Sequence, residues 1–204
     1  MMTTASMRRL AAVISLLGHP LLTSTAFVSF MAWQNLDDDP TAVWSLGSVA
    51  TMAALISLWN LRQTWRGAYS NFDVSQQTQR QSFYPVLLGL LGLATTALFW
   101  QQAGLFRYGL LAAWLLVLIC YTINFWLKIS LHAALSFFLA CLVLHLYSGW
   151  GVLALLLATV IAASRLVLRR HTLPELVTGA IIGVAAGGGL AWFLAHVASN
   201  SKAS

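Results

Sequence analysis

Charged residues are scarce in this chain. Only 8% of its 204 residues are charged, and five are acidic, whereas an ordinary soluble domain carries about 25% charged residues. Hydrophobic residues make up 59% of the sequence, and water solvates a surface of that composition poorly. The composition therefore excludes an ordinary soluble protein and predicts an integral membrane protein. Because the apolar runs follow one another closely, we expect a single domain over residues 1–204.

Cysteines are also few, and both lie inside apolar segments. Cys120 and Cys141 therefore predict neither a disulfide framework nor a metal site. The formal charge of +6 would suggest nucleic-acid binding in a soluble protein, but here the basic residues fall at the ends of apolar runs. Membrane topology and anionic lipid heads explain such positions. We expect membrane lipids as partners and no nucleic acid, and the oligomeric state stays open.

Long apolar runs fill most of the chain. Because a transmembrane helix needs about 20 largely apolar residues, the sequence predicts an all-α polytopic bundle of six to seven transmembrane helices. The seven candidate spans are residues 10–33, 43–61, 84–101, 106–127, 132–148, 149–168 and 173–197. The first run exceeds the core of a signal peptide, about 7–15 residues, so we expect it to be retained. Within it, His19 before Pro20 predicts a kink and a contact with a neighbouring helix.

The basic residues are distributed unevenly between the two predicted membrane faces. Successive spans alternate sides, so the N-terminus and the loops after the second, fourth and sixth spans share one face. That face collects Arg8, Arg9, Arg62, Arg66, Arg80, Lys128, Arg165, Arg169 and Arg170, and the other has Asp37, Asp38, Asp39, Arg107 and Lys202. The positive-inside rule predicts that the basic face is cytoplasmic. The three adjacent aspartates are typical of a solvated loop.

The last predicted span carries a stripe of glycines. Gly179, Gly183 and Gly187 recur at four-residue spacing, so they lie along one face of a helix. A stripe without side chains lets another helix approach closely. We interpret it as a packing surface.

Three polar clusters interrupt the apolar chain, at residues 73–80, 128–132 and 164–175. Alternation of the spans places all three on one face. Ionisable groups near a bilayer are unfavourable and usually functional, although long side chains at helix ends also reach the interface by snorkelling. The clusters are therefore the candidate functional site.

The third cluster has an informative spacing. It reads Ser164-Arg165, five residues, His171, three residues and Glu175. This pattern resembles the last signature of the phosphatidic acid phosphatase type 2 and vanadium haloperoxidase superfamily, in which Asp normally stands at the position of Glu175. The resemblance implies an all-helical fold of the integral membrane lipid phosphatase branch, with a motif-bearing core at about residues 62–197.

The other two clusters match the family less closely. The segment Ile129-Ser130-Leu131-His132 resembles the family's Pro-Ser-Gly-His signature in a degenerate form that keeps the serine and the histidine. Of the family's first signature, Lys, six residues and Arg-Pro, only Arg80 remains, with Asp73 at the lysine position. Lys128 is our candidate for the missing cation.

These residue types suit phosphoryl transfer. Such a reaction spreads negative charge over three oxygens, so catalysis is mainly positioning and cationic stabilisation. The planar fork of arginine matches phosphate oxygens. We expect Arg80, Arg165 and Lys128 to hold the phosphate, with Ser130 and nearby backbone N–H groups as neutral donors.

Histidine supplies the remaining chemistry. A neutral imidazole is a nucleophile when a carboxylate bonds its other ring nitrogen, and His171 and Glu175 are four residues apart. If helical geometry reaches back to His171, the two share one face. Glu175 also fits a capping box with Thr172, so it is either an orienter or a helix cap. His132 would protonate the leaving oxygen and later activate water.

The prediction is a metal-independent hydrolase of lipid phosphomonoesters or diphosphates that acts through a phosphohistidine. Polyprenyl diphosphate, phosphatidate and phosphatidylglycerophosphate all suit such a site. No metal and no cofactor is expected, and no cluster of carboxylates suited to Mg²⁺ lies near these residues in the sequence. We place the protein in a bacterial inner (cytoplasmic) membrane, with its active face on the cytoplasmic side.

Two other classes of function stay open. His132 and His145 lie 13 residues apart in one predicted helix, about 20 Å along its axis. That spacing would suit a membrane haem protein with two stacked haems if a second helix offered matching histidines. The altered first motif and Glu175 also permit a catalytically inactive or transporting membrane protein on the same fold.

Overall fold

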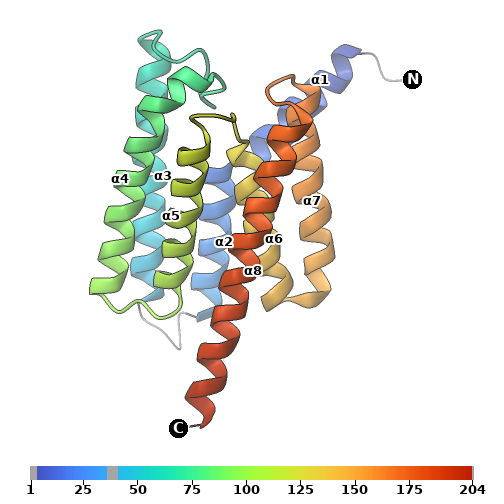
Figure 1. Cartoon of the computed structure of the whole chain (residues 1–204). Coiled ribbons are helices and arrows are strands. Elements are labelled where there is room, and N and C mark those ends of the chain that lie inside the picture. Colours follow the sequence, from blue (N-terminus) through green and yellow to red (C-terminus); the bar gives the residue numbers. More distant parts are fainter. Residues whose placement is uncertain (1–3, 36–40, 204) are drawn as a thin grey trace. The chain divides into compact units, whose positions relative to one another are not determined.

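A computed structural model describes residues 4–35 and 41–203, and these are almost entirely helical (Figure 1). Within them there are eight helices and no strand, which confirms the predicted all-α class. The helices are α1 Thr4–Leu17, α2 Pro20–Asn35, α3 Ala42–Trp65, α4 Gln77–Trp100, α5 Phe106–Ile123, α6 Leu131–Leu146, α7 Ser148–Val167 and α8 Leu173–Ala203. The loop predicted from Asp37, Asp38 and Asp39 lies outside the described residues.

Five of these helices are long and apolar enough to cross a membrane, namely α3, α4, α5, α7 and α8. The first predicted span is broken into α1 and α2, which are bent by 45°. Pro20 begins α2, at the position where a missing backbone N–H does no harm, so the predicted kink at His19 is confirmed. If α1 and α2 together form one bent span, the described residues contain six candidate membrane spans.

Helix α6 differs from the sequence prediction. It has 16 residues, fewer than the about 20 residues that cross a hydrocarbon core. Length and composition therefore support five or six spans among the described residues, and not seven. The short helix ends where Tyr147 leaves helical geometry (φ −139°, ψ 75°), and α7 begins directly after it at Ser148.

The helices group into two compact units. The terminal unit consists of Met1–Ser24 and Leu127–Ser204, and the central unit is Thr25–Trp126. The chain passes between them inside α2 and again just before Leu127. The expectation of a single domain stays a prediction.

In the terminal unit, α6 packs against both α7 and α8, and α1 packs against α7. The glycine stripe of α8 faces α6, as predicted. A methyl group on Gly179 would lie 2.7 Å from the carbonyl oxygen of Ser130, and one on Gly187 would lie 2.7 Å from that of Phe138. One on Gly183 would collide with the carbonyl of Ala134. The two backbones therefore touch along the whole stripe.

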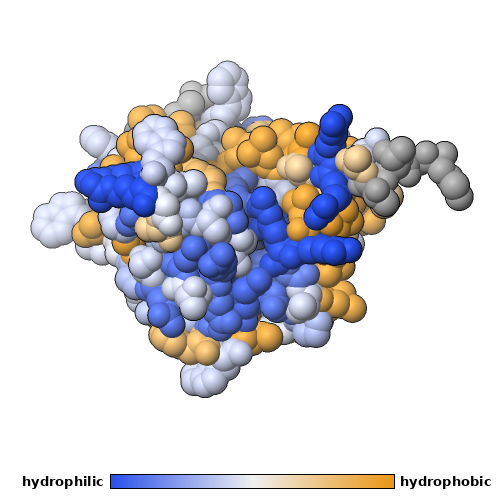
Figure 2. Space-filling model, turned by 90° about the horizontal axis from the view of Figure 1, so that it is seen from above, coloured by the Kyte–Doolittle hydropathy of each residue, from blue (hydrophilic) through white to orange (hydrophobic). Residues whose placement is uncertain are grey.

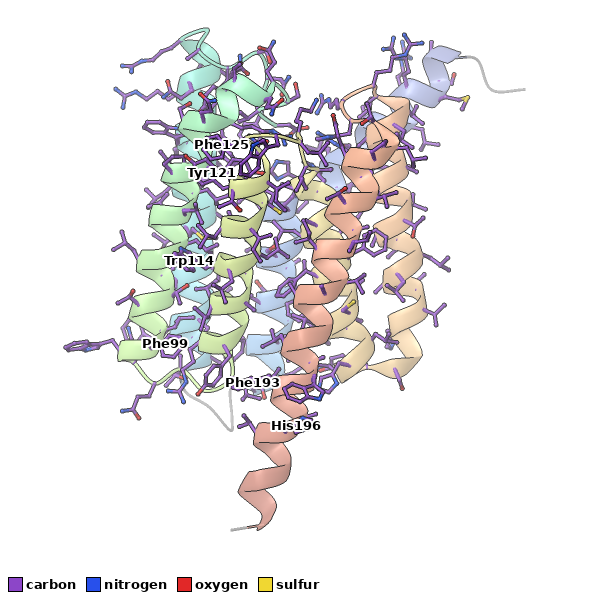
Figure 3. The ribbon with its side chains drawn as sticks, viewed as in Figure 1. Phe99, Trp114, Tyr121, Phe125, Phe193 and His196 are labelled. Atoms are coloured by element: carbon purple, nitrogen blue, oxygen red, sulfur yellow. The ribbon has the colours of Figure 1, made fainter. Side chains whose placement is uncertain are left out.

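In the central unit, α4 packs against α3 and α5. The indole of Trp114 on α5 (Figure 3) donates to the carbonyl oxygen of Leu88 at 3.1 Å. Nearer the α5 C-terminus, Tyr121 stacks on Tyr84 at 5.4 Å between ring centroids and contacts Phe125 at 5.2 Å. Aromatic contacts thus join α4 and α5 along much of their length.

The glycine stripe yields a stability prediction. In Gly183→Ala the new methyl group meets backbone atoms of α6, which cannot rotate away, so the helices must separate. We expect the free energy of unfolding to fall by about 1–3 kcal/mol, as for other overpacked sites. Thermal unfolding in detergent, followed by circular dichroism, measures the change.

The matched control is Gly188→Ala, in the same helix. A methyl group on Gly188 meets nothing within 4 Å, and alanine favours helix. That variant should unfold at or slightly above the wild-type temperature. Equal midpoints for the two variants would show that the stripe does not hold α6.

Candidate active site

The terminal unit brings two of the three polar clusters together. The segment before α6 lies against the first turn of α8, because the backbone N–H of Ser130 donates to the carbonyl oxygen of Glu175 at 3.3 Å. The ammonium of Lys128 donates to the carbonyl oxygen of Arg170 at 2.8 Å. The second and third clusters therefore lie side by side, and their shared membrane face stays a prediction.

A histidine and a carboxylate form the centre of this site. The Nδ1 atom of His171 is 2.7 Å from Oε2 of Glu175, and the His171 side chain is only 1% exposed. Helix α8 begins at Leu173, so the pair forms without helical geometry reaching back to His171. The carboxylate is bonded to Nδ1, so Nε2 is the ring nitrogen that could act as a nucleophile.

The carboxylate of Glu175 also caps the helix. Its Oε2 atom accepts the backbone N–H of Thr172 at 3.2 Å, which is the reciprocal bond of a capping box. The helix then starts with the bond from the Leu176 N–H to the Thr172 carbonyl oxygen, 3.2 Å. The two interpretations of Glu175 are therefore compatible, since one oxygen serves the cap and the histidine together.

An open pocket of about 250 Å³ lies over this pair. It is lined by Lys128, Leu166, Arg169, Arg170, His171, Thr172 and Glu175. Three of these side chains are cationic and one is anionic, so the pocket has an excess of positive charge. Hydrophilic side chains cover the loops at this end of the helices, and hydrophobic ones lie around them (Figure 2).

From the sequence, Arg169 and Arg170 are expected only to mark the basic membrane face. The structure places both at the pocket, and the way α7 ends explains this. The Arg170 N–H bonds the Arg165 carbonyl oxygen at 3.0 Å, and the Arg169 N–H bonds that of Leu166 at 2.8 Å. These two bonds form a Schellman motif, which needs a left-handed residue, and Arg169 takes that conformation with φ 54°.

Arginine in a left-handed conformation is uncommon. Glycine is preferred there, and a non-glycine residue costs about 1 kcal/mol. Strained residues of this kind cluster at functional sites. The sequence signal that could have found Arg169 is its position two residues before His171, inside the third cluster.

Three other predicted residues are buried and do not line the pocket. Arg165 is fully buried, and its Nη1 atom donates to the hydroxyl of Ser15 in α1. Ser130 is the N-cap of α6, where its hydroxyl accepts the Ala133 N–H at 3.4 Å. His132 is 6% exposed, and its ring meets that of His19 edge-on, with 5.1 Å between centroids.

Arg80, the remaining predicted phosphate ligand, belongs to the central unit. Its Nε atom donates to the carbonyl oxygen of Val74 at 3.0 Å, and the residue is 5% exposed. Val74 itself has φ 48°, so the arginine holds an unusual bend of the loop before α4. A role for Arg80 in binding phosphate stays a prediction.

Comparison with known proteins finds no match: no family model, no curated protein and no solved structure resembles the chain. The fold and the site therefore define its class by themselves. Within residues 4–35 and 41–203 it is an all-helical protein with five helices able to cross a membrane, or six spans if the bent α1–α2 pair counts as one. This is consistent with an integral membrane protein, and the chain carries a basic pocket beside a His–Glu pair.

The double use of the Glu175 carboxylate can be tested by amide hydrogen exchange. In Glu175→Ala the Thr172 N–H loses its acceptor, and we expect its exchange to accelerate and the protein to lose about 1 kcal/mol of stability. Glu175→Gln keeps a side-chain oxygen for the cap, so the Thr172 amide should stay protected. Fast exchange already in the wild type would show that the cap does not form.

Proposed function

We propose that this protein is a metal-independent lipid phosphatase similar to the membrane branch of the phosphatidic acid phosphatase type 2 superfamily. The observation that carries the proposal is the His171–Glu175 pair at 2.7 Å beside a basic pocket. The spacing of Arg165, His171 and Glu175 in the sequence supports it independently. Suitable substrates are a polyprenyl diphosphate, a phosphatidate or a phosphatidylglycerophosphate.

The charge of the pocket suits a phosphate group. Lys128, Arg169 and Arg170 together carry three positive charges, and Glu175 carries one negative charge. The excess of two matches a phosphomonoester dianion. The neighbouring N-termini of α6 and α8 add the positive ends of two helix dipoles, which also favour an anion.

The first chemical step is attack by histidine. The lone pair of His171 Nε2 adds to phosphorus in line with the ester oxygen, while Glu175 stabilises the positive charge that develops on the ring. The phosphorus–oxygen bond breaks and its electrons go to the lipid oxygen. That oxygen takes a proton from protonated His132 and leaves as an alcohol or, from a diphosphate, as a monophosphate. A phosphohistidine remains.

The second step releases phosphate. His132, now neutral, takes a proton from water as the water oxygen attacks phosphorus. The phosphorus–nitrogen bond breaks, and its electrons return to His171 Nε2. Inorganic phosphate leaves, and His132 is protonated again. The cycle needs only histidine chemistry and the surrounding cations.

Exposed apolar side chains beside the pocket support a lipid rather than a soluble phosphate ester. Leu166 lines the pocket and is 37% exposed, and Leu173, the first residue of α8, is 61% exposed. Val167 and Val177 continue the apolar surface along α7 and α8 at 38% and 47% exposure. A basic pocket at the end of apolar helices suits a phosphate head with a hydrocarbon tail.

Phosphate release from a panel of lipid phosphates tests the proposal. The purified protein in detergent with EDTA should release inorganic phosphate from at least one of the three lipid classes. His171→Ala removes the nucleophile and should lower kcat by about 10⁴-fold or more. Wild-type protein mixed with ³²P-labelled substrate and quenched in alkaline detergent should carry an alkali-stable, acid-labile phosphohistidine, and the variant should carry none.

The outcomes separate the candidate functions. Absence of turnover on every lipid would refute the phosphatase and favour the inactive or transporting alternative. Activity that EDTA removes and a divalent cation restores would refute the metal-independent mechanism. A Soret band in the purified protein would favour the haem alternative.

The membrane side of the site is a separate prediction. The excess of basic residues predicts that the pocket faces the cytoplasm. Arg169 is exposed, so Arg169→Cys places a thiol at the pocket. In intact bacterial cells this thiol should resist a membrane-impermeant maleimide and should react after the cells are broken. The wild type, whose Cys120 is buried and Cys141 half-buried, gives the background, and labelling in intact cells would reverse the assignment.

A further inference from the structure

We infer that the end of α1 is part of the active site, where Ser15 and His19 position two residues of the proposed machinery. Ser15 contacts Arg165, and His19 contacts His132. The inference rests on the proposed function, because it assigns roles relative to that reaction. Neither residue belongs to the three sequence clusters.

The side chains of Ser15 and His19 lie on the same face at the end of α1. Ser15 and His19 are four residues apart, and helical hydrogen bonding continues nearly to this point, with the Gly18 N–H bonded to the Ile14 carbonyl oxygen at 2.8 Å. Residues at this spacing lie one above the other. A single short segment can therefore reach α7 with one side chain and α6 with the other.

Close packing fixes that segment. A methyl group on Gly18 would lie 2.5 Å from Cγ1 of Ile161 in α7, so the glycine lets α1 lie directly against α7. Directly after it, Pro20 starts α2 with a fixed φ. The segment between the two helices is therefore fixed on both sides. The hydroxyl of Ser15 and the ring of His19 are fixed with it.

Ser15 acts on the guanidinium of Arg165. Both residues are buried, with 4% and 0% exposure, and Nη1 of the arginine donates to the serine hydroxyl. A guanidinium is a rigid planar fork, so holding one terminal nitrogen sets the direction of the other. Ser15 therefore sets the direction of the Arg165 fork, and we assign the other end of that fork to a phosphate oxygen in the proposed reaction.

His19 acts on the ring of His132. The two rings meet nearly at right angles, 86°, with centroids 5.1 Å apart. The His19 ring is itself held, because its Nδ1 accepts the Leu21 N–H at 3.3 Å. A fixed ring packed edge-on against His132 limits how that side chain can turn, and so holds the orientation that the proposed proton transfer would use.

Steady-state kinetics on a lipid substrate distinguish the two roles. Ser15→Ala frees one end of the Arg165 fork and should raise KM about tenfold, whereas Ser15→Thr keeps a hydroxyl and should restore it. His19→Ala lets the His132 ring turn and should lower kcat about tenfold with little change in KM, whereas His19→Phe keeps a packing ring and should recover most of kcat.

Two variants of the terminal unit serve as controls. Thr159→Ala removes a hydroxyl from α7 that bonds only along its own helix, to the Leu155 carbonyl oxygen. His196→Ala removes a histidine from the distant part of α8 (Figure 3). Both should keep the wild-type kcat and KM. All variants are compared after purification at equal folded fractions, judged by circular dichroism.

Three results would overturn the inference. Wild-type kinetics in both Ser15→Ala and His19→Ala would show that α1 does not act on the site, while the turnover itself would leave the proposed function standing. Losses that Thr and Phe do not restore would assign a structural role to both residues. No turnover by the wild type refutes the proposed function, and the inference with it.

Discussion

The contact between the backbones of α6 and α8 is the constraint on which the site depends. Gly179 brings the start of α8 against Ser130, and Gly183 and Gly187 continue the contact along α6. With ordinary side chains on this stripe the helices would stand several ångströms further apart. The bond between the Ser130 N–H and the Glu175 carbonyl would then be lost, and the two polar clusters would no longer meet.

The start of α8 links helix formation to the proposed chemistry. A carboxylate at the third helical position is already favourable there, because it meets an unbonded N–H and the positive end of the helix dipole. The same oxygen of Glu175 reaches His171. The orientation of the histidine is therefore set by the interaction that begins the helix.

Local patterns in the sequence predicted most of the fold and the core of the site. The helices, the kink at His19, the glycine stripe and the pairing of His171 with Glu175 all depend on residues close together in the chain. Other features depend on long-range contacts, and local spacing carries no signal for those. Ser15 and Arg165 are 150 residues apart. The sequence also did not predict that α6 is short. Its composition resembles that of a transmembrane span, but the helical geometry ends at Tyr147.

The scarcity of acidic residues has a consequence for the buried cation. Three of the five acids are Asp37, Asp38 and Asp39, in one short stretch, which leaves Asp73 and Glu175 elsewhere. The partner that α1 offers to Arg165 is a serine hydroxyl, which accepts a hydrogen bond and carries no charge. A carboxylate in that place would satisfy the guanidinium but neutralise it. A neutral partner fixes the direction of the arginine without neutralising its charge through that contact, and the proposed phosphatase would use this charge for an anionic substrate.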